Sequence, residues 1–136
     1  MLEKYIEGLT EEKAIRMAMQ SGGAKTRADA MAYLRKSIPK EPYYQTKIKK
    51  ALEKRYPEAV TKKIAQGYYS QNGIPDIMFI KGGHYFGFEV KRPILGTLSG
   101  IQKQTITQIR DAGGTAEVIS YPEEAIRVIE DYFRNE

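Results

Sequence analysis

The sequence predicts an α/β fold, and three observations support this prediction. Residues 77–90 hold two apolar runs separated by Gly82-Gly83, which is the pattern of a β-hairpin. A further apolar run at residues 115–120 predicts another strand. Apolar side chains recur at the spacing of a helix face in three stretches, residues 43–55, 99–112 and 122–133. Strands and helices that follow one another in this way are typical of a sheet covered by helices.

Two short helices are predicted before this core. Residues 3–20 have helical character, and Thr10 is placed to cap the second half of that stretch. Thr26 marks the start of a second helix that runs to about Lys36. We interpret residues 1–40 as an N-terminal helical extension, which could be an added packing layer or a dimerisation element.

The register of the hairpin follows from its turn. A Gly-Gly pair suits a two-residue turn because both central residues need a positive φ. Lys81 then pairs with His84, and Asp76 faces Glu89 across the two strands. Side chains alternate between the two faces of a strand. One face is therefore apolar and belongs to the core: Ile77, Phe79, Phe86, Phe88 and Val90.

The other face of the hairpin carries two acids in direct opposition, Asp76 and Glu89, with Lys91 beyond them. Facing Cβ atoms lie roughly 4.5–5.5 Å apart, and like charges at that distance repel. Such a pair needs a cation, a raised pKa or full solvation. Lys91 is one available cation, and a hard divalent metal ion with oxygen ligands is a stronger candidate. Facing acids at strand ends can also be simply solvated.

The helix predicted at residues 43–55 follows Pro39 and Pro42 and offers two faces. One arc is apolar and contains Gln45. A separate stripe is basic, and two more lysines follow on a strand predicted at residues 59–66: Lys47, Lys50, Lys54, Lys62 and Lys63. The helix at residues 99–112, with Ser99 as its N-cap, likewise carries one amide, Gln102, in an apolar arc. Because a buried amide needs a partner, the two glutamines suggest a shared polar site.

Composition narrows the function further. The chain has no cysteine and one histidine, which excludes a disulfide scaffold, Cys-based zinc sites and Cys nucleophiles. We see no signal-peptide pattern and no apolar run of membrane-spanning length, so we expect a cytoplasmic protein, or one in the host cytoplasm for a virus. Residues 35–63 carry ten basic against three acidic side chains, which suits a polyanion partner or a solvated surface.

Several of these motifs resemble one enzyme family. Pro75-Asp76, an apolar strand and then Glu89-Val90-Lys91 resemble the signature of PD-(D/E)XK nucleases. Three flanking segments are similar to the virus-type replication-repair (VRR-NUC) branch of that superfamily: Gly73-Ile74, Leu98-Ser99-x-x-Gln102 and Ala112-Gly113-Gly114. The resemblance covers about residues 41–120. It implies a restriction-endonuclease-like core over residues 41–136, with a mixed central sheet flanked by helices.

The resemblance also implies a catalytic site. Asp76 and Glu89 would bind Mg²⁺ or Mn²⁺, with the backbone carbonyl of Val90 as a third ligand. Lys91 would orient or deprotonate a water molecule acidified by the ion and stabilise the charge on the phosphate oxygens. Gln102 would position Lys91 or that water.

Gln45 is where the sequence departs from the family pattern. The helix that contains it often presents a glutamate to the metal site in that family, and Gln45 stands at what looks like the matching position. An amide could hydrogen-bond a water molecule at the ion but brings no charge. Gln45 is equally consistent with a satisfied amide at the edge of the core.

The sequence therefore predicts a metal-dependent, structure-specific DNA endonuclease that cuts flaps, nicks or four-way junctions. The exposed lysines of residues 47–63 would hold flanking phosphates, so binding should weaken with salt. The alternative is a non-catalytic DNA- or RNA-binding module with the same fold. A small-molecule enzyme lacks any Gly-rich phosphate loop or cofactor fingerprint. A two-fold dimer would present two sites to two strands, but the sequence fixes no oligomeric state.

Overall fold

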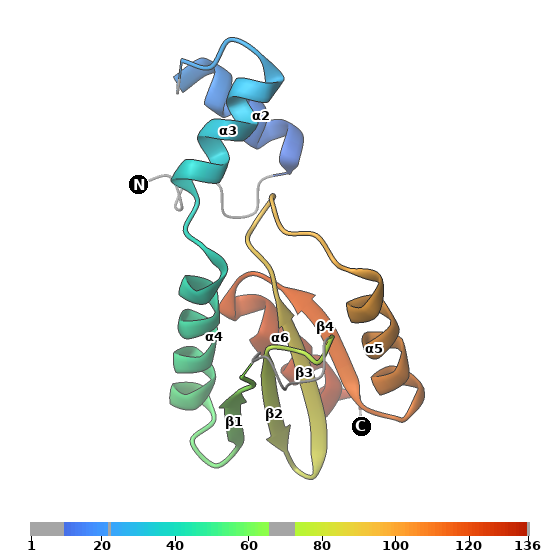
Figure 1. Ribbon diagram of the computed structural model, residues 1–136. Helices are drawn as coiled ribbons and strands as arrows, with labels where there is room; N and C mark the ends of the chain where they lie inside the picture. The colour runs from blue at the N-terminus through green and yellow to red at the C-terminus, as the bar shows by residue number, and fades with distance from the viewer. Residues whose placement is uncertain (1–9, 22, 66–72, 136) are drawn as a thin grey trace. The chain divides into compact units, whose positions relative to one another are not determined.

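The protein is described by a computed structural model, which covers residues 10–21, 23–65 and 73–135 (Figure 1). The helix predicted for residues 3–9 lies outside the described residues. Two compact units form. The first consists of the chain up to Lys40 together with Arg92–Gly96, and the second contains Glu41–Lys91 and the chain from Thr97 onward. None of the helices in the described ranges has the length and apolar character needed to cross a membrane.

The first unit contains the helices α2 (Glu11–Ser21) and α3 (Arg27–Ser37). Both helices begin directly after the predicted N-cap residues, Thr10 and Thr26. The Thr10 hydroxyl accepts a hydrogen bond from the Lys13 amide at 3.2 Å, and that of Thr26 accepts one from the Asp29 amide at 3.1 Å. The guanidinium group of Arg92 donates hydrogen bonds to three backbone carbonyls at the C-terminal end of α3, those of Arg35, Ile38 and Pro39.

The second unit is built on a four-stranded mixed sheet of order β1-β2-β3-β4. The strands are β1 (Val60–Lys63), β2 (Ile77–Lys81), β3 (His84–Val90) and β4 (Thr115–Ile119). The first three run antiparallel to their neighbours, and β4 runs parallel to β3. The helices α4 (Glu41–Arg55), α5 (Gly100–Asp111) and α6 (Pro122–Arg134) flank this sheet (Figure 1).

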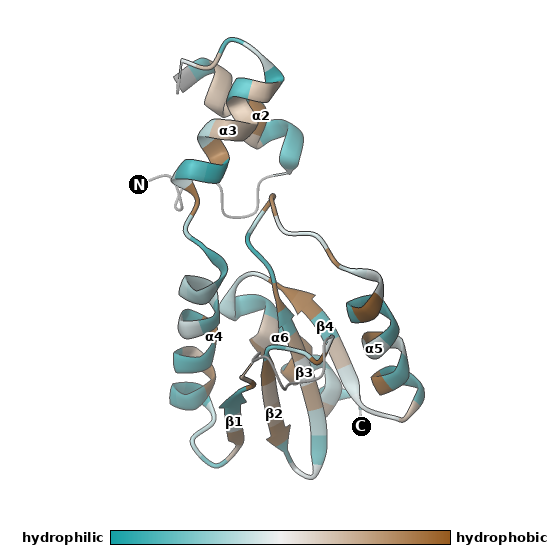
Figure 2. Cartoon of the chain, viewed as in Figure 1, coloured by the Kyte–Doolittle hydropathy of each residue, from teal (hydrophilic) through white to brown (hydrophobic). Residues whose placement is uncertain are grey.

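The hairpin register is confirmed. Lys81 pairs with His84 and Ile77 with Phe88, while Gly82 and Gly83 have φ values of 57° and 77°. The predicted core face is also confirmed, since all five of its apolar side chains are fully buried: Ile77, Phe79, Phe86, Phe88 and Val90. Rings of α6 pack on this face, with Tyr132 edge-on to Phe86 at a centroid distance of 5.5 Å. In Figure 2, β2 is accordingly brown and much of α4 is teal.

Two boundaries differ from the prediction. Helix α4 begins at Glu41, two residues earlier than expected, so that Pro42 lies in its first turn. Proline is tolerated there because the first backbone N–H groups of a helix have no intrahelical acceptor. Strand β1 is also shorter than the stretch 59–66, and its buried side chain is Thr61.

Candidate metal centre

Three carboxylates converge at one end of the sheet. Glu41 begins α4, Asp76 directly precedes β2, and Glu89 lies near the end of β3. One oxygen atom from each of the three lies within 4.8 Å of the others. Asp76 is 5% exposed and Glu89 only 1%, so neither acid is a solvated surface group. The structure thus brings together the two acids that the hairpin register paired and adds a third.

Asp76 is fixed by the backbone of the strands around it. The Val90 amide donates to Asp76 Oδ2 at 2.7 Å, and the Ile64 amide donates to the Asp76 carbonyl at 2.7 Å. The preceding Pro75 packs against Gly87, where an added Cβ would lie 2.8 Å from the Pro75 Cγ atom. Gly87 therefore lets the Pro75-Asp76 segment approach β3 closely enough for this contact.

Glu89 is the acid whose charge is least tolerated. Burial, then the hydrogen bond and the negative charge of Asp76, raise the pKa of Glu89 to about 9, with Lys91 acting in the opposite direction. Its Oε2 atom lies 3.2 Å from Gln102 Nε2 and 3.8 Å from Lys91 Nζ. Its Oε1 atom is buried and, in the ionised acid, has no hydrogen-bond donor within the described part of the chain, since the hydrogen bond with Asp76 requires one of the two acids to be protonated.

The same causes act on Glu41. Burial and then the negative charge of Asp76 raise the pKa of Glu41, and Lys91 lowers it. A buried carboxylate oxygen without a partner costs free energy that a ligand could recover. Clustered carboxylate oxygens are the donors that Mg²⁺, Mn²⁺ and Ca²⁺ prefer. The cluster therefore fits a divalent metal ion, and such an ion would favour the ionised forms of all three acids.

Gln102 holds Glu89 from the start of α5. Ser99 and Gln102 form a capping box, in which Gln102 Oε1 accepts from the Ser99 amide at 3.0 Å and Ser99 Oγ accepts from the Gln102 amide at 3.1 Å. The Nε2 group of Gln102 remains free to donate to Glu89. The predicted N-cap is confirmed. The structure adds Glu89 as a partner of Gln102, and its expected role toward Lys91 or a water molecule stays a prediction.

Glu41, and not Gln45, is the residue of α4 that brings a carboxylate to the cluster. Glu41, Gln45, Ile48 and Leu52 follow one another at helical spacing, so Glu41 continues the buried stripe of α4 to its first turn. Glu41 was not predictable from the pattern used, because a proline at position 42 favours a helix start after it. An acid followed by proline at a helix start is the signal that could have located it. Gln45 is buried one turn further along, and its part in the site stays a prediction.

Two of the carboxylates, those of Glu41 and Asp76, line a cavity of about 400 Å³, and Glu89 lies behind them. Its lining combines the polar groups of the site with a small apolar rim: Glu41, Gly73, Ile74, Asp76, Lys91, Ser99, Ile101 and Gln102. Lys91 is 14% exposed at its side chain, so its ammonium group is reached mainly through this cavity. Beside it, the backbone is held by β4, because the Lys91 amide donates to the Ile119 carbonyl at 2.9 Å. Val90 as a carbonyl ligand stays a prediction.

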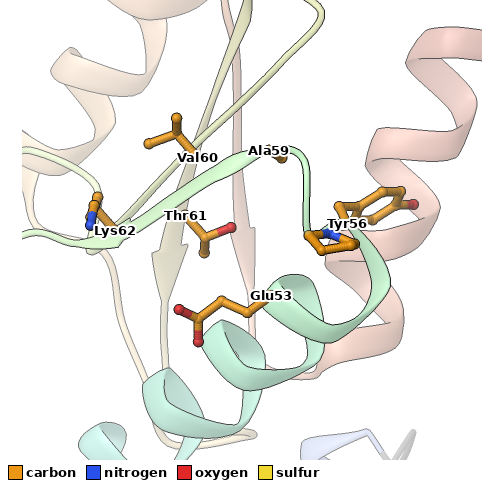
Figure 3. Close-up of a pocket in the computed structure, with 7 residues that line it drawn as sticks. Glu53, Tyr56, Ala59, Val60, Thr61 and Lys62 are labelled. Atoms are coloured by element: carbon orange, nitrogen blue, oxygen red, sulfur yellow. The ribbon is translucent and has the colours of Figure 1, made fainter.

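The five lysines predicted to bind nucleic acid are all exposed. Lys47, Lys50 and Lys54 lie on the face of α4 opposite its buried stripe, and none of them lines the cavity of the carboxylates. Lys62 lines a second cavity of about 370 Å³ between α4 and β1, together with Glu53 and Thr61 (Figure 3). Contacts of these lysines with DNA stay a prediction and require a substrate that extends beyond the carboxylate cavity.

Comparison with known proteins gives one informative match. A solved structure described as "VRR_NUC domain" superposes with a TM-score of 0.53 at 20% sequence identity, over 65% of this chain and 97% of that one. No family model matches the sequence, and no curated protein matches it. The predicted fold class is confirmed. The chain has an α/β fold similar to that of the VRR_NUC domain, and its sheet end carries three acids that could bind a divalent metal ion.

Proposed function

We propose that this protein is a divalent-metal-dependent DNA endonuclease that hydrolyses phosphodiester bonds. The observation that carries the proposal is the buried carboxylate cluster with a lysine at its edge, open to a cavity of about 400 Å³. The likeness of the fold to a VRR_NUC domain supports the proposal. Lysine and arginine exceed acids by five over the whole chain, which favours a polyanionic substrate.

The polar residues at and beside the cavity have separate roles in this mechanism. Glu41, Asp76 and Glu89 would hold Mg²⁺ or Mn²⁺, and the Val90 carbonyl would be the further ligand expected from the family resemblance. When bound, the ion acidifies a water molecule and stabilises the negative charge on the phosphoryl oxygens. Lys91 faces the same cavity and is placed to orient the attacking water and to neutralise charge on the phosphate.

Gln102 acts through Glu89 in this scheme. Its hydrogen bond of 3.2 Å to Glu89 Oε2 holds one oxygen of that acid, and the other oxygen, Oε1, would be available to an ion. Gln102 is itself fixed by the capping box with Ser99. We therefore regard Gln102 as a positioning residue, and its expected contribution is the orientation of the carboxylate.

The substrate and assembly are proposed from the family resemblance. Flaps, nicks and four-way junctions are the expected DNA structures, and a homodimer would present two sites to two strands of a junction. The exposed lysines of α4 and β1 would contact phosphates outside the cavity.

A cleavage assay tests the proposal. Linear, nicked, flap and four-way junction DNA is incubated with Mg²⁺ or Mn²⁺, with the wild type and with Asp76→Asn. We expect wild-type cleavage that chelation abolishes, and no cleavage by Asp76→Asn although it still binds DNA. A variant that cuts like the wild type would show that the site is wrong. Salt-sensitive binding by a wild type that cuts nothing would favour the non-catalytic binding module.

A further inference from the structure

The first turn of α5 presents neighbouring side chains in two directions. Gln102 points into the site and donates to Glu89. Ile101 lines the same cavity and is 50% exposed, the largest exposed fraction of any large apolar side chain in the described ranges. An apolar surface therefore lies at the mouth of a cavity whose interior is formed by Glu41, Asp76 and Lys91.

Ile101 is held rigidly in that position. A Cβ atom added to Gly73 would lie 2.5 Å from Ile101 Cγ2 and 3.0 Å from its carbonyl oxygen, so the backbone of Gly73 packs tightly against this residue. Gly73 has a φ of 89°, a backbone conformation that residues other than glycine rarely adopt. On the helix, the Thr105 hydroxyl donates to the Ile101 carbonyl at 3.1 Å. Isoleucine in a helix is confined largely to one rotamer, so its exposed half is a fixed platform.

Location separates Ile101 from an ordinary exposed apolar residue. Single apolar side chains on a surface are common and need no explanation. Val118 on β4 is an example, since it is 40% exposed and does not line the cavity. Ile101 differs because it lines the same cavity as Glu41 and Asp76, next to the place that the proposed function gives to the phosphate.

The chemistry of DNA limits what can cover Ile101. The sugar-phosphate backbone is polar and anionic, and the faces of bases inside a continuous duplex are covered by their neighbours. An unstacked base exposes an apolar face. Isoleucine and similar side chains are among those that proteins place against such faces where the duplex is opened.

We propose that Ile101 packs against the face of an unpaired base next to the scissile phosphate. The inference rests on the proposed function, because it takes the carboxylate cavity as the place of the phosphate. It makes Ile101 a specificity-determining residue that favours DNA with a free single strand at the cutting site over continuous duplex. The contact is apolar, so it adds to binding without adding to its salt dependence.

Binding in Ca²⁺ tests this contact separately from cleavage. The affinities of the wild type, Ile101→Ala and the matched control Val118→Ala are measured by fluorescence anisotropy for a flap and for a continuous duplex of the same sequence. A 2-aminopurine in the flap next to the junction reports contact with the base. We expect Ile101→Ala to lose about fivefold or more in affinity for the flap alone, together with its change in 2-aminopurine fluorescence. Val118→Ala and Ile101→Leu should behave like the wild type.

The outcomes separate the two proposals. A wild type without preference for the flap, or an Ile101→Ala variant that keeps the full preference, overturns the role of Ile101 whether or not DNA is cut. Equal losses in Ile101→Ala and Val118→Ala overturn it as well. A flap preference that needs Ile101 in a protein that cuts nothing supports the base contact and rejects the nuclease. Thermal unfolding of each variant shows whether a loss reflects misfolding. If Ile101→Ala misfolds, Ile101→Thr carries the test, because it keeps the β-branched shape, is less apolar and should lose the flap preference.

Discussion

The two ends of the β2–β3 hairpin differ in how well their charged and polar side chains are partnered. At the turn, Lys81 Nζ lies 4.4 Å from the ring centroid of Phe133 and 3.9 Å from Glu58 Oε1. His84 Nε2 lies 2.8 Å from Thr115 Oγ1, and its ring stacks on Tyr132 at 3.8 Å. Both charged or polar side chains of the turn thus have partners supplied by the fold.

At the other end, the same two strands bring acids together. Asp76 and Glu89 meet Glu41, and Oε1 of the ionised Glu89 has no hydrogen-bond donor in the described ranges. Lys91 is the nearby cation, at 3.8 Å from Glu89 Oε2. One register therefore produces a satisfied end and an end that costs free energy unless a cation is added. The comparison shows that buried charged groups without sufficient partners indicate a functional site better than polar groups whose partners the fold supplies.

The largest expected effect comes from Glu89→Gln, which removes the buried carboxylate. The amide keeps the shape of the side chain but cannot carry a negative charge or bind a hard cation well. We expect DNA cleavage to fall by about a thousandfold or more, since a ligand of the ion is lost. In the metal-free protein we expect the melting temperature at neutral pH to rise, because the variant no longer has to take up a proton at this buried position when it folds. Cleavage rates and thermal melts in chelator check both parts.

The turn end provides the control for that variant. His84→Ala removes the stacked ring and the contact with Thr115, so it should lower the melting temperature and leave the metal requirement of cleavage unchanged. If Glu89→Gln also lowers the melting temperature in chelator, the two ends do not differ in the way the structure indicates.

Adding the ion should stabilise the acidic end next most strongly. At a free Mn²⁺ concentration of about one hundred times its dissociation constant, the stabilisation is about 2.7 kcal/mol. Thermal melts with and without Mn²⁺ measure it, and Glu41→Gln should reduce the shift because it removes one of the three acids. A Mn²⁺ shift of the same size in wild type and in a Glu41→Gln, Asp76→Asn double variant would place the ion elsewhere.

The stability of the metal-free protein should depend on pH with a definite sign. The pKa of Glu89 is raised to about 9 in the folded protein from an ordinary value of 4.5, so the folded state binds the proton more tightly than the unfolded state. The contribution of this group is fully present below about pH 4.5 and is lost as the pH rises toward 9. We expect the free energy of unfolding without metal, measured by urea denaturation, to fall from pH 5 to pH 8 relative to Glu89→Gln. A wild type whose pH profile parallels that of Glu89→Gln would contradict the raised pKa.

The smallest effect should come from the basic face of α4. Replacing Lys47 and Lys50 by alanine should weaken DNA binding moderately and reduce the slope of log affinity against log salt by about two. The variant should keep the metal-induced melting shift, because neither lysine lines the carboxylate cavity. Binding titrations at several salt concentrations check this prediction, and an unchanged slope would remove this face from the DNA interface.

Local rules were enough to predict part of this molecule. The Gly82-Gly83 turn and side-chain alternation gave the hairpin register, the core face and the meeting of Asp76 with Glu89, because each depends on neighbouring residues alone. Capping chemistry likewise predicted Ser99 as an N-cap. The α/β fold class followed from the same patterns and is confirmed by the similar solved structure.

Features that depend on packing between distant elements were not predictable in this way. Glu41 joins the site because α4 starts two residues early and points its first turn at the sheet end. The partner of Gln102 depends on how α5 lies against β3. Ile101 stands at the helical spacing of the apolar positions of α5, yet it is half exposed, because the buried residue of that helix is Ile106, further along.

The hydrogen bond from the Val90 amide to Asp76 has a consequence for how the protein matures. It links Asp76, which precedes β2, to the main chain at the end of β3. Pairing of β2 with β3 in this register therefore brings Asp76 next to Glu89. Closure of the hairpin and assembly of the acid pair are then a single event. Ion affinity should therefore appear with the tertiary fold itself during refolding, and no later rearrangement of the acids should be needed.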